Sequence, residues 1–163
     1  MRISQQIFPR PIILVTTINK EGKPNVMTAS FVMPVSFEPK YLAFSISPQR
    51  YTFENLKETK EFVVNVASKE MKEKAEICGS FSGRTKDKFK LANLEVEKAS
   101  IVKAPLLKEC PISFECKLEF MKEFGDHFIV VGKVVKEHVR KEDFEPLLHS
   151  SGKEYKISKP LEK

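Results

Sequence analysis

The sequence predicts a mainly β fold, a barrel of short strands with two or three helices outside it. Short β-branched and apolar segments recur between turn-forming residues, one long segment alternates between apolar and polar residues, and the helical patterns fall irregularly between strands. The chain has 163 residues, enough for one hydrophobic core and too few for two ordinary domains. We therefore expect a single domain over residues 1–163.

The first strand is expected at residues 12–17, which are β-branched and apolar and lead into turn formers at residues 21–25. Prolines and the Ser47–Arg50 segment break the chain that follows. Further short strands are expected between these breaks, at residues 26–30, 31–35 and 41–46.

Two helices are expected next. Thr52 is predicted to cap the first helix, which buries Phe53 and Leu56 and ends near Lys60. A strand at residues 62–66 follows it.

Ser68 is predicted to cap the second helix and Gly79 to end it. Residues 79–90 then form a polar loop. One face of this helix is apolar and is expected to be buried: Met71, Ala75 and Cys78.

The clearest strand pattern lies at residues 112–120, where apolar and polar residues alternate. We expect its apolar residues in the core and its polar residues in solvent. Residues 128–135 begin apolar on both faces, which indicates a central strand or one covered by a second subunit. Residues 125–127 form the turn between these two strands.

The net charge of +6 comes from 28 Lys and Arg against 22 Asp and Glu, and such an excess raises the hypothesis of a nucleic-acid-binding module. Lysine and glutamate alternate along most of the chain, however, which is typical of solvated helix faces. Residues 84–90 carry four cations and one aromatic residue, too little aromatic surface for stacking on bases. The pattern therefore disfavours nucleic-acid binding.

The three cysteines show no pairing pattern, which favours a reducing compartment. No apolar run approaches the roughly 20 residues that span a bilayer, and the first residues do not resemble a secretion signal. We expect a cytoplasmic protein without a membrane segment. The three histidines stand eleven residues apart and no cysteine pair has zinc-ligand spacing, so no metal site is expected.

An anion site is expected at residues 45–52, where a strand gives way to a helix. Free N–H groups and the dipole of a helix N-terminus attract a phosphate, while Thr52 offers a hydroxyl and Arg50 a bidentate guanidinium. The alternative is that Thr52 only caps the helix and Arg50 is solvated. Residues 79–83 lack the lysine of a phosphate loop and the spacing of a dinucleotide turn, so they read as a connector.

Several short segments, taken in order and spacing, carry a resemblance over most of the chain: residues 9–12, 22–25, 27–31, 35–39, 51–52, 61–66, 82–84, 87–89, 125–127 and 152–155. Together they resemble the flavin reductase-like family of FMN-binding split barrels, which includes flavoredoxins and ferric reductases. The resemblance implies a split β-barrel of Greek-key-like topology that forms a homodimer. It also implies non-covalent FMN in a groove near the subunit interface.

The resemblance assigns roles to individual residues. Ser45, Ser47, Arg50 and Thr52 would bind the FMN phosphate, with Lys88 assisting. Asn25, Thr28, Ala29 and Ser30 would run along the flavin ring and ribityl chain, and Phe31 would pack on the ring. His127 would approach the ring as the catalytic residue, and Tyr155 would belong to the cofactor site.

The function that follows from the resemblance is an NAD(P)H-dependent flavin or ferric reductase, which passes electrons from NADH or NADPH through FMN to a small-molecule or protein acceptor. The alternative within the family is a flavoredoxin-type electron carrier that oxidises nicotinamides poorly. No acid–base pair or nucleophile is evident in the sequence. That is expected where the cofactor performs the chemistry.

Overall fold

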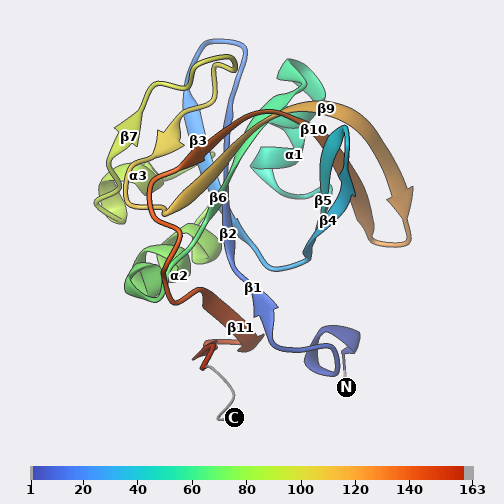
Figure 1. Ribbon diagram of the computed structural model, residues 1–163. Coiled ribbons are helices and arrows are strands. Elements are labelled where there is room, and N and C mark those ends of the chain that lie inside the picture. The colour runs from blue at the N-terminus through green and yellow to red at the C-terminus, as the bar shows by residue number, and fades with distance from the viewer. Residues whose placement is uncertain (1, 160–163) are drawn as a thin grey trace.

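The computed structural model describes residues 2–159 and confirms a mainly β fold. Its main sheet has seven antiparallel strands in the order β3-β2-β6-β9-β10-β5-β4 (Figure 1). In chain order these strands are β2 (Ile13–Ile18), β3 (Pro24–Ala29), β4 (Val32–Phe37), β5 (Lys40–Ile46), β6 (Glu61–Val66), β9 (Ile112–Phe124) and β10 (His127–Val139).

The sheet curls into a barrel that stays split between its two edge strands. β3 and β4 stand at opposite ends of the strand order, yet only Ser30 and Phe31 join them in the chain. Two strands joined by two residues have their linked ends close together, so the sheet must fold back on itself. No ladder pairs β3 with β4 within residues 2–159, and the barrel wall is therefore open there.

Apolar side chains fill both sides of β2. Val15 packs inside the barrel with Phe44 and Phe62, whose rings meet edge to face at 5.5 Å. Leu14 points to the other side and packs against Ala75 of helix α2 (Lys72–Ser80). The strand is buried on both faces, which explains why its sequence is apolar at consecutive positions.

The barrel interior requires a glycine in β10 at the point that the Phe62 ring of β6 reaches across β9. A Cβ on Gly132 would lie 2.4 Å from Cζ of Phe62, so no larger residue fits without displacing that buried ring. The register between β9 and β10 also shifts between Val131 and Gly132, and such a bulge bends the hairpin around the barrel.

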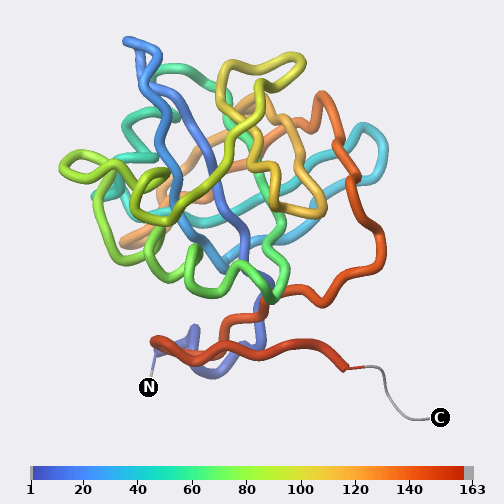
Figure 2. Tube along the Cα trace, turned by 90° about the vertical axis from the view of Figure 1, so that its left-hand side faces the viewer, coloured from blue at the N-terminus to red at the C-terminus, as the bar shows by residue number. Residues whose placement is uncertain are grey.

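Helices and two small sheets surround the barrel. The β1 (Arg10–Pro11), β11 (Leu147–Ser151) and β12 (Glu154–Ile157) strands hold the first and last segments together below the barrel (Figure 2). The β7 (Val96–Glu97) and β8 (Leu106–Leu107) strands form a two-stranded sheet. The helices are α1 (Tyr51–Thr59), α2, α3 (Lys88–Leu91) and the short 3-10 helices η1 (Ile3–Gln5) and η2 (Lys69–Met71).

Three predictions about helix ends are wrong. Thr52 does not cap α1, because the helix begins one residue earlier and Thr52 lies buried in its first turn. Ser68 caps no helix with its side chain, and α2 runs through Gly79 to end at Ser80. Residues 79–90 are not one loop, since Asp87 accepts a hydrogen bond from the Lys90 N–H and caps α3.

The prediction that the polar residues of β9 face solvent is also wrong for two of them, because Ser113 and Glu115 are fully buried. The Glu115 carboxylate accepts N–H bonds of 2.7–2.9 Å from the loop at residues 100–102, and His138 lies 2.7 Å away. Burial by itself would raise the pKa of Glu115, but these hydrogen bonds lower it to about 2. The loop therefore covers a sheet face that the alternating pattern assigns to water.

The three cysteines, Cys78, Cys110 and Cys116, are all buried and unpaired. Burial raises the pKa of the Cys78 thiol to about 11 and raises those of the other two further. Cys116 packs in the barrel core, as predicted.

Candidate functional site

A polar cavity of about 330 Å³ lies between the start of α1 and the end of α2. The segment before α1 contributes Ser47 and Arg50, and the α1 side chain of Thr52 faces them. The end of α2 and the loop after it contribute Ser80 and Ser82. Hydroxyls and cations thus surround a space that is large enough to hold an anionic group.

Lys88 is the buried cation of this cavity. Its side chain comes from the first turn of α3 and is only 5% exposed. Its ammonium donates one hydrogen bond, of 3.0 Å, to the carbonyl of Cys78, and no carboxylate within residues 2–159 lies within 4.0 Å of it. The pKa of Lys88 is lowered to about 8, mainly by burial and in smaller part by the nearby positive charge of Arg50.

An ammonium has three donors, and a buried one that uses a single acceptor is poorly compensated. A phosphate in the cavity would provide both the missing acceptors and the missing negative charge. Lys88 is therefore the residue whose surroundings most clearly call for an anion.

Asn25 ties the strand side of the cavity to α1. Its amide nitrogen donates to Oγ1 of Thr52 at 2.8 Å, while its Oδ1 is buried without a hydrogen-bond partner in the described chain. The backbone of Gly83 packs directly on this oxygen, because a Cβ there would lie 1.9 Å from it. Asn25 therefore places a buried acceptor without a partner beside the cavity, and Gly83 covers it.

The loop after α2 is held over the cavity by Arg84. One terminal nitrogen of its guanidinium donates to the carbonyl of Gln49 at 3.0 Å, and the other pairs with the Glu54 carboxylate. The guanidinium also lies 5.5 Å from the ring centre of Tyr51. Residues 81–84, which we call the cavity strap, are thereby fastened to α1.

The cavity continues as a groove along the open edge of β3. A second hollow of about 320 Å³ has Thr28, Arg50, Gly79 and Ser80 in common with the first. It extends past the end of β3 to the C-terminal hairpin. Its further lining residues include Ala29, Ser30, Glu76, His149 and Tyr155.

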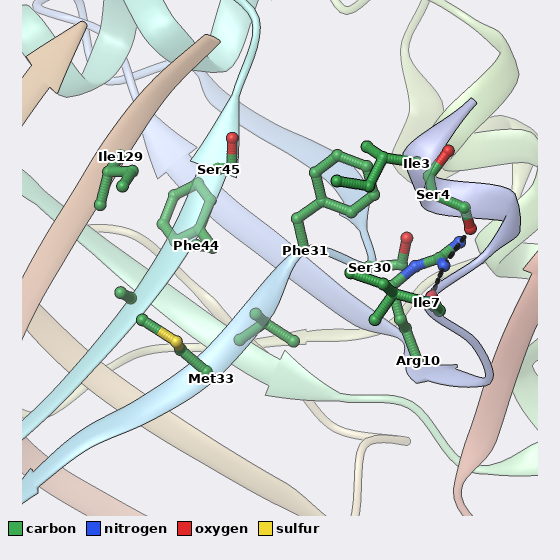
Figure 3. Close-up of a pocket in the computed structure, with 12 residues that line it drawn as sticks. Ile3, Ser4, Ile7, Arg10, Ser30, Phe31, Met33, Phe44, Ser45 and Ile129 are labelled. Carbon is green, nitrogen blue, oxygen red and sulfur yellow. Dashed lines mark hydrogen bonds between the residues drawn. The ribbon is translucent and has the colours of Figure 1, made fainter. Parts of the chain in front are cut away.

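Arg10 fixes the far end of this groove. Its terminal nitrogens donate to the carbonyls of Ser4 and Ile7 (Figure 3). They also donate to the carbonyl of Ser150 at 3.2 Å and to Nδ1 of His149 at 3.1 Å. Nε2 of His149 lies 3.0 Å from the Gly152 carbonyl, so His149 carries its proton on Nε2 and accepts at Nδ1. These bonds join the N-terminal segment to the β11–β12 hairpin.

Most residues that the sequence assigns to cofactor binding lie in this groove. Asn25, Thr28, Ser47, Arg50, Thr52 and Lys88 line its first part, and Ala29, Ser30 and Tyr155 line its second. Phe31 and Ser45 instead line a separate hollow, about 380 Å³ in volume. The geometry gives no support to a phosphate contact by Ser45, because its side chain is on the wall of that other hollow.

His127 lies at the start of β10, outside the residues that line these three hollows. Its ring centre is 6.1 Å from that of Phe31, and Nδ1 is 2.8 Å from the exposed carboxylate of Asp126. Its catalytic role stays a prediction.

Sequence reasoning missed several lining residues. Ser80 and Ser82 belong to the stretch that reads as a connector, and Arg84 belongs to a run of cations that reads as a solvated loop. The end of a helix beside glycine and serine residues was the available signal. No sequence pattern pointed to Glu76 or His149, because they are distant from Ser30 in the chain and only the fold brings them close to it. Within residues 2–159 no cluster of three metal-ligating side chains occurs, and no helix is long and apolar enough to cross a membrane.

The fold and the site together define the class of this protein, which is a split antiparallel β-barrel with a cationic groove along its open edge. Comparison with known sequences assigns the chain more closely, because residues 4–158 match the family described as flavin reductase like domain. The chain therefore belongs to the flavin reductase-like family, as its sequence motifs indicate.

Individual relatives agree with this assignment. An uncharacterized protein of Archaeoglobus fulgidus is 36% identical over 132 residues, which are 80% of this chain and 73% of that protein. A flavin reductase of Pseudomonas putida is 28% identical over 145 residues, covering 89% and 82% of the two chains. The crystal structure of a flavoredoxin from Methanosarcina acetivorans superposes with a TM-score of 0.86 at 28% identity, covering 100% of this chain and 93% of that one.

Proposed function

We propose that this protein holds FMN non-covalently in the groove, with the phosphate in the cavity around Lys88 and the ring directed toward Ser30. The observation that carries the proposal is the buried ammonium of Lys88, which has one acceptor and faces a cavity lined by hydroxyls and Arg50. Charge-assisted hydrogen bonds to a phosphate satisfy such a group.

The residues present fit the chemical parts of FMN. Arg50, Lys88, Ser47 and Thr52 would receive the phosphate, and the open edge of β3 at Thr28 would run along the ribityl chain. When bound, FMN would supply two-electron hydride chemistry. The task of the chain itself is then to bind, to orient and to limit water, which requires no nucleophile.

This placement is tested by comparing FMN with riboflavin, which has the same ring and ribityl chain but lacks the phosphate. We expect FMN to bind at least about 100-fold more tightly in equilibrium titrations, since several charge-assisted bonds depend on the phosphate. Equal affinities for the two ligands would show that the phosphate does not bind in the cavity.

We further propose that the protein is an oxidoreductase that accepts hydride from NADH or NADPH and passes electrons to a second acceptor. The flavin reductase name of the Pseudomonas putida relative supports this reaction. The flavoredoxin from Methanosarcina acetivorans favours the alternative, an electron carrier.

Anaerobic mixing of the FMN-loaded protein with NADH or NADPH separates these two functions. Bleaching of the flavin on the timescale of turnover supports the reductase. A flavin that dithionite reduces and nicotinamides do not supports the carrier.

We also propose that the protein acts as a homodimer. Val35 and Phe37 of β4 are 49% and 91% exposed, and large apolar side chains exposed on an edge strand are typical of an interface. Sedimentation analysis tests the proposal, and a Phe37→Glu variant is expected to shift the protein toward monomer.

A further inference from the structure

A third hollow, of about 380 Å³, opens beside Ser30 and is almost wholly apolar (Figure 3). Two of its walls are the N-terminal segment and the barrel strands β4, β5 and β10. Its main apolar lining residues are Ile3, Ile7, Phe31, Met33, Phe44 and Ile129. Ile3 and Ile7 are 69% and 64% exposed, so two large aliphatic side chains flank this hollow without being buried.

The charged group of this hollow is Arg10, and both of its terminal nitrogens already donate hydrogen bonds. One terminal nitrogen donates to two carbonyls, and the other donates to a third carbonyl and to His149. Nε is buried without a hydrogen-bond partner in residues 2–159. No free pair of N–H groups remains to hold a carboxylate or phosphate in the bidentate manner. An anion would therefore lose its hydration in a mostly apolar hollow that offers serine hydroxyls but no free pair of cationic donors in return.

The positive charge of Arg10 nevertheless acts on this space, because no carboxylate in the described residues pairs with it and its guanidinium lies 5.5 Å from the ring centre of Phe31. A positive charge in apolar surroundings stabilises a nearby oxygen that carries partial negative charge. A conjugated carbonyl provides such an oxygen without the desolvation cost of a full charge.

The hollow also lies next to the groove. Ser30 lines both, and Phe31 follows it directly. The volume of about 380 Å³ lies at the small end of the range of roughly 300–1,000 Å³ for sites that bind small molecules. A flat ring compound of one or two fused rings suits this space.

We propose that this hollow binds a neutral, flat ring compound with a conjugated carbonyl, a quinone or a related enone, at the end of the groove. A redox role for this hollow rests on the proposed function, in which such a compound is the second electron acceptor. Overall, the nicotinamide would give a hydride and solvent a proton, and the quinone would leave as its hydroquinone. Binding itself does not depend on that reaction.

The test is a binding experiment on the full chain labelled at its isoleucine methyl groups and followed by NMR. The probe is naphthoquinone methylated at both free carbons of its quinone ring, so that it cannot alkylate cysteine. We expect the methyl signals of Ile3, Ile7 and Ile129 to shift in a saturable manner, and that of the exposed Ile101 to stay unchanged. The comparison ligand replaces one of the two methyl groups by a hydroxyl group directly on the quinone ring, and this hydroxyl is ionised at neutral pH. We expect this anion to bind at least about tenfold more weakly.

Two matched variants complete the test. Ile7→Glu places a charge at the mouth of the hollow and is expected to weaken binding of the neutral quinone by about tenfold or more. Ile101→Glu makes the same change at an exposed site outside it and is expected to have no effect. FMN binding is titrated separately in both variants, so a failure of the quinone site is distinguished from a failure of the flavin site.

Equal binding of the anion and the neutral quinone would overturn the proposal, as would unchanged binding in Ile7→Glu. It would also be overturned if the signals of Ile3 and Ile7 moved with protein concentration and not with the quinone. In that case a second copy of this chain would cover the hollow.

Discussion

Replacing Lys88 by methionine tests the anion site most directly, because methionine keeps the length of the side chain and removes its charge. A hydrogen bond to a charged group contributes about 1.5–3 kcal/mol, so losing it predicts FMN affinity weaker by about 10- to 150-fold. Fluorescence titration of FMN measures the effect. Lys90→Met is the matched control, since Lys90 lies on the same short helix α3 but its side chain is 87% exposed.

Lys88→Met is also expected to change how FMN affinity depends on pH. Lys88 has a pKa of about 8 in the flavin-free protein, and a bound phosphate would raise it. Below pH 8 the ammonium is mostly charged, and between about pH 7 and pH 8, where the FMN phosphate is still a dianion, FMN affinity changes little. Above pH 8, binding must first take up a proton, so affinity falls by up to about tenfold per pH unit. This slope should be present in the parent and in Lys90→Met, and absent in Lys88→Met.

Folding stability separates this role from a structural one. Replacing a poorly compensated buried charge with an apolar side chain is often neutral or stabilising, so the Tm of flavin-free Lys88→Met should equal or exceed that of the parent. The reasoning is refuted if Lys88→Met binds FMN within about threefold of the parent and keeps the pH slope.

Two further predictions concern the cavity strap and the buried carboxylate. Arg84→Gln removes the charge that fastens the strap to Glu54, so FMN should leave this variant about tenfold faster in stopped-flow release experiments. The control variant Lys86→Gln should release FMN at the parent rate. Equal release rates from Arg84→Gln and the parent would show that the strap does not limit release. Because Glu115 has its pKa lowered from 4.5 to about 2, its contribution of about 3 kcal/mol is complete above pH 4.5 and is lost as the pH falls toward 2. Denaturant unfolding of Glu115→Gln should therefore show a deficit at pH 7 that narrows near pH 3, and a deficit independent of pH would contradict this assignment.

Local sequence patterns predicted the barrel strands well, because alternation and turn residues report directly on strands. They failed where one side chain satisfies a backbone segment far away in the chain. Glu115 reads as a solvent-facing residue of a two-sided strand, yet it binds three N–H groups of the loop at residues 100–102. A polar residue in an alternating strand predicts exposure only if nothing covers that face.

Lys88 shows the same limit in the site itself. Within residues 84–90 it is one of four cations, and such a run is typical of a solvated loop. The short helix capped by Asp87 turns Lys88 inward and leaves Lys90 in water, two residues further on. The resemblance to the family pointed to Lys88, whereas the charge pattern alone did not distinguish these two lysines.

The position of the groove follows from the split in the barrel. β3 pairs with β2 on one side only, so the backbone groups on its other edge have no ladder partner in the described sheet. An unpaired edge must be covered, bound or solvated. Here the end of α2 approaches but does not seal it, and Thr28 bonds to the α2 carbonyl of Ala75 at 2.7 Å while leaving the groove open beside Gly79 and Ser80. A closed barrel of the same strands would pair this edge and would leave no backbone groups there to receive a ribityl chain.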